Sequence, residues 1–212
     1  MGKVRAVFID RDGVVNELVY HQEAGIIDSP FTTEQFRLLP DVGKAIRMFH
    51  DGGYKVILVS NQPGIAKRCL SQETFDAIRE KMRQELARGG ASLDGEYYCF
   101  HHPEAKVDEL QVNCSCRKPE PGLLLQAAQD MGIELSQSWM IGDNLTDVKA
   151  GAAAGCQTIL LGRIKCELCN LMDEEEARPD GILSDLGKAA QIILGKGDET
   201  WTSLLTRQTL LK

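Results

Sequence analysis

The chain has 212 residues, of which 43% are hydrophobic, and a formal net charge of −7 at pH 7. A chain of this length and apolar content can bury the core of one domain. Its negative charge argues against a nucleic-acid groove, because phosphate backbones require clustered cations. The N-terminal residues contain too few apolar side chains for a signal peptide or a membrane span. We therefore expect a cytosolic protein whose cysteines are thiols or metal ligands, with neither nucleic acid nor membrane as a partner.

Short apolar runs rich in β-branched residues predict strands that are buried on both faces. These runs are residues 5–10, 54–60, 95–100, 138–143, 156–162 and, more weakly, 179–185. Helical periodicity lies between them, at residues 41–53, 71–90, 122–133, 146–155 and from about Asp185 onward. The alternation of strands and helices favours an α/β fold with a Rossmann-like, mostly parallel sheet and helices on both faces. We expect one domain over residues 1–195, without a large cap domain, and a short helix or loose tail over residues 196–212.

Polar groups follow the predicted strands at their C-terminal ends, where an open α/β sheet binds its ligand. Asp10 and Asp12 follow the first strand, two residues apart, so both carboxylates can reach one site. Ser60 follows the second strand, Asp143 the fourth, and Lys118 lies beyond the third. Carboxylates suit a hard cation, whereas a hydroxyl, loop amides and a lysine suit an anion. The pattern predicts a magnesium-bound phosphate, with one aspartate attacking phosphorus and the other protonating the leaving oxygen.

Ligands typical of zinc gather between the third strand and Lys118. One imidazole and three thiols in this segment form a closed tetrahedral set, which is typical of a structural zinc site: Cys99, His101, Cys114 and Cys116. The insert over residues 99–116 is too short and polar to form its own core, so zinc would order it. The last ligand lies two residues before Lys118, and the metal would therefore fix the loop that carries this lysine.

Alternatives remain for the other cysteines and histidines. His102 is a possible zinc ligand in place of His101, and three ordinary buried thiols are a less favoured interpretation of the cysteines in the cluster. Cys166 and Cys169 form a separate "CELC" sequence, which we interpret as two free thiols in preference to a redox pair or a second metal clip.

Four motifs, "FIDRDGVVN", "VSNQPGIA", "CRKPEPG" and "IGDNLTD", resemble those of the haloacid dehalogenase superfamily of phosphatases. Together with "YYCFHHP" and "CSCRKPEPG", the first motif further resembles the D-glycero-D-manno-heptose 1,7-bisphosphate 7-phosphatase family, over roughly residues 4–162. Histidinol-phosphate phosphatase is a relative that shares this pattern.

The resemblance implies a role for each matched residue. Asp10 would be the nucleophile that forms an aspartyl-phosphate, and Asp12 the general acid and then the general base. Asp10, the backbone carbonyl of Asp12, and Asp143 would bind magnesium, and His101 matches the histidine of the zinc set. The remaining matched positions would bind substrate or its phosphate: Arg11, Ser60, Asn61, Gln62, Arg117, Lys118 and Asn144.

The expected enzyme is a magnesium-dependent, zinc-containing phosphomonoesterase and a monomer that acts on a small phosphorylated sugar or metabolite. A heptose 1,7-bisphosphate cleaved at C7 is the preferred substrate, and histidinol phosphate is the alternative. The intact aspartate pair disfavours a non-catalytic phosphosugar-binding module. Asn144 departs from the family, whose members often have lysine there, and Lys67 and Arg68 could supply the missing charge. Residues 17–36, a long segment after the first motif, would read the distal end of the substrate.

Overall fold

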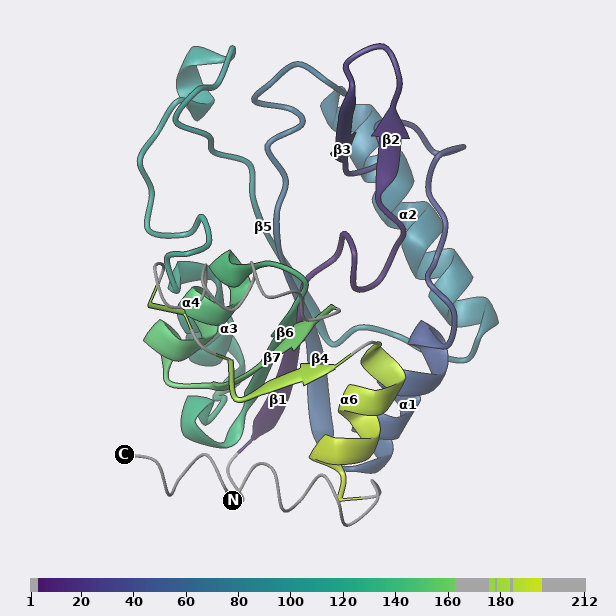
Figure 1. Cartoon of the computed structure of the whole chain (residues 1–212), viewed down its shortest axis with the longest axis vertical. Helices are drawn as coiled ribbons and strands as arrows, with labels where there is room; N and C mark the ends of the chain where they lie inside the picture. The colour runs from purple at the N-terminus through teal and green to yellow at the C-terminus, as the bar shows by residue number, and fades with distance from the viewer. Residues whose placement is uncertain (1–3, 163–175, 178, 184, 196–212) are drawn as a thin grey trace.

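The computed structural model describes residues 4–162, 176–177, 179–183 and 185–195 (Figure 1). Within these residues a six-stranded sheet has the order β5-β4-β1-β6-β7-β8, and all neighbouring strands in it are parallel. Its strands are β1 (Arg5–Ile9), β4 (Tyr54–Asn61), β5 (Gly95–Cys99), β6 (Trp139–Gly142), β7 (Gln157–Leu161) and β8 (Gly181–Leu183). Each lies within or beside one of the six predicted runs, so the parallel sheet is confirmed.

Helices cover both faces of the sheet, as predicted. They are α1 (Val42–Asp51), α2 (Gln72–Arg88), α3 (Gly122–Met131), α4 (Leu145–Ala154) and α6 (Leu186–Ile193), with short 3₁₀ turns η1 (Asp108–Leu110) and η2 (Leu135–Gln137). Alternate residues of β1 point to opposite faces. Val7 and Ile9 belong to the core under α1, α2 and α6, whereas Ala6 and Phe8 belong to the core under α3 and α4. Figure 1 shows α1 and α6 on one side of the sheet and α3 and α4 on the other.

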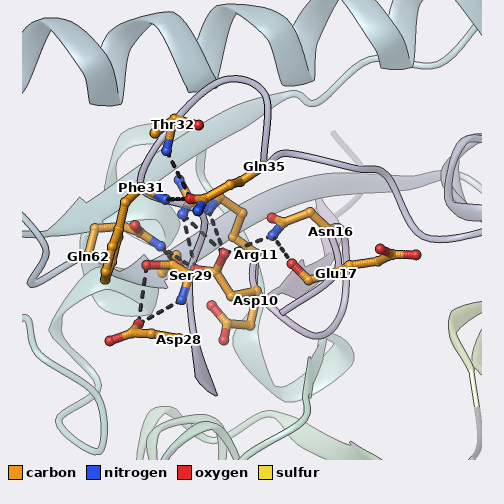
Figure 2. A network of polar contacts seen from close by, with 12 residues as sticks. Asp10, Arg11, Asn16, Glu17, Asp28, Ser29, Phe31, Thr32, Gln35 and Gln62 are labelled. Atoms are coloured by element: carbon orange, nitrogen blue, oxygen red, sulfur yellow. Dashed lines mark hydrogen bonds and ion pairs between the residues drawn. The ribbon is translucent and has the colours of Figure 1, made fainter. Parts of the chain in front are cut away.

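A small antiparallel hairpin, β2 (Val19–His21) and β3 (Ile26–Asp28), was not predicted. It rises beyond the C-terminal edge of the sheet (Figure 1). Its strands are three residues long and largely exposed, so they lack the buried pattern that identified the other strands. The segment after the hairpin is held by local bonds (Figure 2): Gln35 Oε1 accepts from the backbone N–H groups of Phe31 and Thr32, at 2.8 and 3.2 Å.

The part of the chain that the structure describes contains this hairpin but no separate cap domain. Among the same residues, none of the helices combines the length and apolarity that a bilayer crossing requires. Cys166, Cys169 and the predicted tail over 196–212 lie outside the described residues, so the single domain over 1–195 stays a prediction.

Candidate active site

Three carboxylates converge at the C-terminal edge of the sheet. Asp10 follows β1, Asp143 follows β6, and Asp147 lies in the first turn of α4; their oxygens lie within 4.8 Å of one another. The backbone N–H of Asp10 donates to the carbonyl of Ile141 at 3.0 Å, which ties the end of β1 to β6. Gly13 has a φ of 77°, and a Cβ at this position would overlap the Asp143 carboxylate. The glycine is therefore required for the turn and for the close approach of Asp143.

Lys118 faces this carboxylate cluster from the loop after β5. Its ammonium lies 2.9 Å from Asp10 Oδ1 and 2.6 Å from Asp147 Oδ1, and it donates to the carbonyl of Val59 at 2.9 Å. Lys118 is only 2% exposed. One lysine against three carboxylates leaves an excess of negative charge, a donor set that fits a divalent cation with a preference for oxygen ligands.

Burial and mutual repulsion perturb the ionisation of the cluster. Burial, with the charges of Asp10 and Asp147, raises the pKa of Asp143 to about 7. Burial also raises the pKa of Asp147 to about 6, against the opposing effect of Lys118. Burial alone would lower the pKa of Lys118, but the charges of Asp10 and Asp147 raise it above its ordinary value. The lysine therefore stays charged at neutral pH, while Asp143 and Asp147 hold protons to higher pH than exposed acids would.

The Asp12 carboxylate has a separate environment. It accepts from Gln62 Nε2 at 2.6 Å, from Asn16 Nδ2 at 2.9 Å and from Arg11 Nη2 at 3.1 Å. In Figure 2, Asn16 and Gln62 lie on opposite sides of Arg11. The structure thus places Asp12 among nitrogen donors, and the binding of magnesium by its backbone carbonyl stays a prediction.

Several predicted phosphate ligands instead form side-chain hydrogen bonds to other residues of the protein. The Arg11 guanidinium is buried against Asp12 and does not lie at the open edge of the site. Asn61 forms two bonds with the backbone of Lys118, donating from Nδ2 to its carbonyl at 2.9 Å and accepting its N–H at 3.0 Å. Ser60 Oγ accepts from Gln62 Nε2 at 3.0 Å and is buried.

The other two predicted substrate ligands are Asn144 and Arg117. Asn144 is the N-cap of α4: its Oδ1 accepts from the N–H of Thr146 at 3.1 Å, so this side chain is used in capping. Arg117 donates to the carbonyl of His101 at 3.2 Å and is half-buried, which leaves part of the guanidinium accessible.

A cavity of about 570 Å³ opens beside Asp143 and Gly13. Apolar side chains such as Leu18 and Leu39 form much of its wall, and its other charged residues are Asp41 and Asp185. Among the described residues, its lining is acidic and apolar, without a basic side chain.

The four predicted zinc ligands lie together, as a tetrahedral metal site requires. Cys116 Sγ is 3.2 Å from the sulfurs of both Cys99 and Cys114, and His101 Nδ1 is 3.4 Å from Cys116 Sγ. His102 faces a different partner, since its Nδ1 accepts from the N–H of Glu104 at 3.0 Å. The geometry therefore favours His101 over His102 as the fourth member of the cluster.

Asp147 and Asn16 are the site residues that the sequence-based assignment omitted. Asp147 Oδ2 accepts from the N–H of Asn144 at 3.1 Å, as the acid of a capping box does. A capping box alone accounts for an acidic residue at this position, with no ligand required. The contact of Asp147 with Lys118 therefore cannot be inferred from the spacing. The sequence signal was Gly142, because a Cβ at this position would overlap the Asp147 side chain.

Comparisons with known proteins agree with this geometry. A family model described as HAD-hydrolase-like matches residues 115–189. D-glycero-beta-D-manno-heptose-1,7-bisphosphate 7-phosphatase from Yersinia pestis is 38% identical over 190 residues, which cover 90% of this chain and 95% of that protein. The protein of the same name from Haemophilus ducreyi is 42% identical over 164 residues, covering 77% of this chain and 85% of that one.

Among solved structures, D,D-heptose 1,7-bisphosphate phosphatase from B. bronchiseptica, complexed with magnesium and phosphate, matches with a TM-score of 0.73 and 28% identity. The match covers 92% of this chain and 100% of that one. The fold, the sequence identity and the clustered acidic residues all indicate the same family. The chain is thus a HAD-like phosphatase, a phosphoric monoester hydrolase, and belongs to the D-glycero-beta-D-manno-heptose-1,7-bisphosphate 7-phosphatase family.

Proposed function

We propose that this enzyme removes the C7 phosphate of D-glycero-D-manno-heptose 1,7-bisphosphate with Asp10 as its nucleophile and magnesium as its cofactor. The observation that supports this most directly is the position of Asp10, at 2.9 Å from Lys118 and within 4.8 Å of Asp143. A carboxylate attacks a phosphate dianion only when positive charge at the site neutralises the phosphoryl oxygens. Buried Lys118 provides one positive charge at that position.

Asp10, Asp143 and, through its backbone carbonyl, Asp12 are the proposed magnesium ligands, and Asp147 is a further candidate. When bound, magnesium would neutralise charge on the phosphoryl oxygens and orient them. Ser60 and the backbone amides around Asn61 complete the proposed phosphate site. The side chain of Asn61 instead holds the backbone of Lys118 in position.

The proposed reaction has two steps that share one acid–base group. Asp10 attacks phosphorus, the ester P–O bond breaks, and Asp12 gives its proton to the leaving oxygen of the sugar. Water then attacks phosphorus of the aspartyl-phosphate, Asp12 takes the proton of that water, and inorganic phosphate leaves with Asp10 regenerated. Asp12 is suited to both steps because its side chain is 13% exposed and so can meet a ligand.

The distribution of charge supports one orientation of the substrate. The cavity beside Asp143 contains Asp41 and Asp185 and disfavours the C1 phosphate. Arg117 lies in the loop after β5, directly before Lys118, and donates to the carbonyl of His101; we assign it to the C1 phosphate. Histidinol phosphate, the alternative substrate, is not favoured by the names of the relatives.

We also propose that zinc, bound by Cys99, His101, Cys114 and Cys116, orders the loop before Lys118. Its support is the close approach of the four donor atoms, at 3.2–3.7 Å for the pairs in hydrogen-bonding distance. A cytosolic location and a monomeric state belong to the same proposal, and size-exclusion chromatography with light scattering tests the second.

A phosphate-release screen over heptose 1,7-bisphosphate, histidinol phosphate and other sugar phosphates tests the substrate. Phosphorus NMR of the product should show the C1 phosphate retained and the C7 phosphate gone. Asp10→Asn should abolish release with the fold intact, whereas Asp76→Asn, an exposed acid on α2, should have no effect. Persistent turnover by Asp10→Asn would remove Asp10 from the role of nucleophile.

A further inference from the structure

Nitrogen donors from two parts of the chain hold both oxygens of Asp12. Oδ1 accepts from Asn16 Nδ2 at 2.9 Å and from Arg11 Nε and Nη2 at 3.2 and 3.1 Å. Oδ2 accepts from Gln62 Nε2 at 2.6 Å and from Arg11 Nη2 at 3.2 Å. The three donor residues are 0–3% exposed, whereas the Asp12 side chain is 13% exposed. The carboxylate is therefore reachable, but the groups that orient it are not.

The backbone fixes these donors before any ligand binds. A tight turn joins Arg11 to Asn16, since the N–H groups of Val15 and Asn16 both donate to the Arg11 carbonyl, at 2.7 and 3.0 Å. Gln62 comes from the end of β4, and its N–H donates to the carbonyl of Cys99 at 2.7 Å. The Arg11 guanidinium also lies 5.8 Å from the centre of the Phe75 ring. Its Nε and Nη2 are bonded to Asp12, and its buried Nη1 has no hydrogen-bond partner. The guanidinium is thus held against Asp12 and away from solvent.

We propose that Arg11 and Gln62 are positioning residues, which hold the Asp12 carboxylate for proton transfer, and that neither binds phosphate directly. This inference rests on the proposed function, in which Asp12 is the general acid and base. A carboxylate with both oxygens bonded has little freedom to rotate, so it stays aimed at the oxygen that leaves and at the water that replaces it.

Gln62 also links Asp12 to the phosphate site. Its Nε2 donates to Asp12 Oδ2 at 2.6 Å and to Ser60 Oγ at 3.0 Å. One amide group therefore sets the separation between the acid–base residue and a hydroxyl that is proposed to contact the phosphoryl group. Arg11 contacts both oxygens of Asp12, Oδ1 from Nε and Nη2 and Oδ2 from Nη2.

The dependence on the leaving group separates positioning from phosphate binding. A sugar alkoxide needs the proton of Asp12 as the P–O bond breaks, whereas p-nitrophenolate is a weak base and leaves without it. With the sugar phosphate, a misplaced Asp12 should therefore slow both steps. With p-nitrophenyl phosphate, it should slow only the second step, the hydrolysis of the aspartyl-phosphate. Loss of a phosphate ligand would instead weaken the first step with both substrates.

The test compares Gln62→Met and Arg11→Lys with the wild-type enzyme and with Gln72→Met, a control for an exposed glutamine at the start of α2. We expect kcat for heptose bisphosphate to fall roughly 10–100-fold, within the range that general acid–base catalysis supplies. KM should change by less than about twofold. With p-nitrophenyl phosphate, a rapid burst of nitrophenolate should precede slower turnover. Gln62→Met tests the proposal even if Arg11→Lys fails to fold.

Asp12→Ala, measured in parallel, separates the inference from the proposed function. If Asp12→Ala slows the first-turnover release of the sugar and of nitrophenolate equally, the acid role of Asp12 is wrong and the inference fails with it. If Asp12→Ala discriminates between the leaving groups but Gln62→Met and Arg11→Lys do not, the positioning role alone is refuted. A rise in KM at unchanged kcat would assign these two side chains to substrate binding.

Discussion

The buried ion pair between Lys118 and Asp147 should couple the two residues strongly. Their charged atoms are 2.6 Å apart and each side chain is 1% exposed. Lys118→Met would leave Asp147 buried without its cation, which typically costs about 3–5 kcal/mol of unfolding free energy. Asp147→Asn should cost less, because Lys118 keeps Asp10 at 2.9 Å. Since contacting residues couple by about 0.5–3 kcal/mol, we expect a coupling energy of about 2–3 kcal/mol.

Urea unfolding of the wild type, the two single variants and the double variant, followed by circular dichroism, measures this coupling energy. The experiment belongs at pH 8 and without added divalent cations, since the carboxylate of Asp147, with a pKa of about 6, is ionised there. At pH 5 the same cycle should give a smaller coupling energy, because Asp147 is then largely protonated.

Lys55 and Asp94 supply a matched control. Their charged atoms are 2.8 Å apart, but the side chains are 41% and 21% exposed. A Lys55→Met and Asp94→Asn cycle should give only about 0.2–1 kcal/mol. If the Lys118–Asp147 cycle gives no more than this surface pair, the two charges are not held together in a buried site, and the proposed placement of Lys118 at Asp10 loses its basis.

Three further predictions concern the metal sites. Gly13→Ala should abolish phosphate release because its Cβ would overlap the Asp143 carboxylate. The control Gly25→Ala, also at positive φ but in open space, should lower the unfolding free energy by about 1 kcal/mol and keep activity. Equal activity losses in the two variants would indicate backbone strain alone. Between pH 3.8 and about 7 the raised pKa of Asp143 makes the folded chain bind a proton that the unfolded chain has lost. Without divalent cations Tm should therefore fall as pH rises through this window, and the gain in Tm from added Mg²⁺ should grow; a pH-independent gain would contradict this. Cys116→Ser should lose about one zinc per chain and lower Tm and activity, and exposed Cys69→Ser should do neither; full activity in a zinc-free variant would refute the scaffolding role.

The sheet, the helices and the two clusters of potential metal ligands could be predicted because each depends on a long or regularly spaced sequence pattern. Buried runs identified the strands, and the rule that strand ends meet at one edge brought Asp10 and Asp143 together. Paired spacing identified the zinc set. The hairpin over residues 19–28 could not be predicted in this way, because its three-residue strands are largely exposed and show no burial pattern.

The directions in which several side chains of the candidate site point could not be predicted from the sequence. Arg11 directly follows Asp10, and the family resemblance implied a phosphate ligand at this position; only the turn to Asn16 directs the guanidinium toward Asp12. Asn144 satisfies an N-cap pattern and Asp147 a capping box, and these local functions are indistinguishable in sequence from contacts with a ligand or with Lys118. Tertiary packing therefore determines whether such a residue caps a helix, contacts another side chain or faces a ligand, which the local sequence pattern does not distinguish.

The position of Lys118 depends on restraints applied to its backbone on both sides. A lysine loses up to about 2 kcal/mol of side-chain entropy when it is fixed, and its charge must be desolvated here, so a loosely held loop would release it to solvent. Asn61 bonds both the N–H and the carbonyl of Lys118, which anchors this residue to the end of β4. The cluster that ends at Cys116 fixes the chain just before it. Asn61 acts on Lys118 itself, and the zinc proposed for this cluster would act on the chain that leads to it. The two restraints are therefore complementary, and loss of either should move the ammonium away from Asp10.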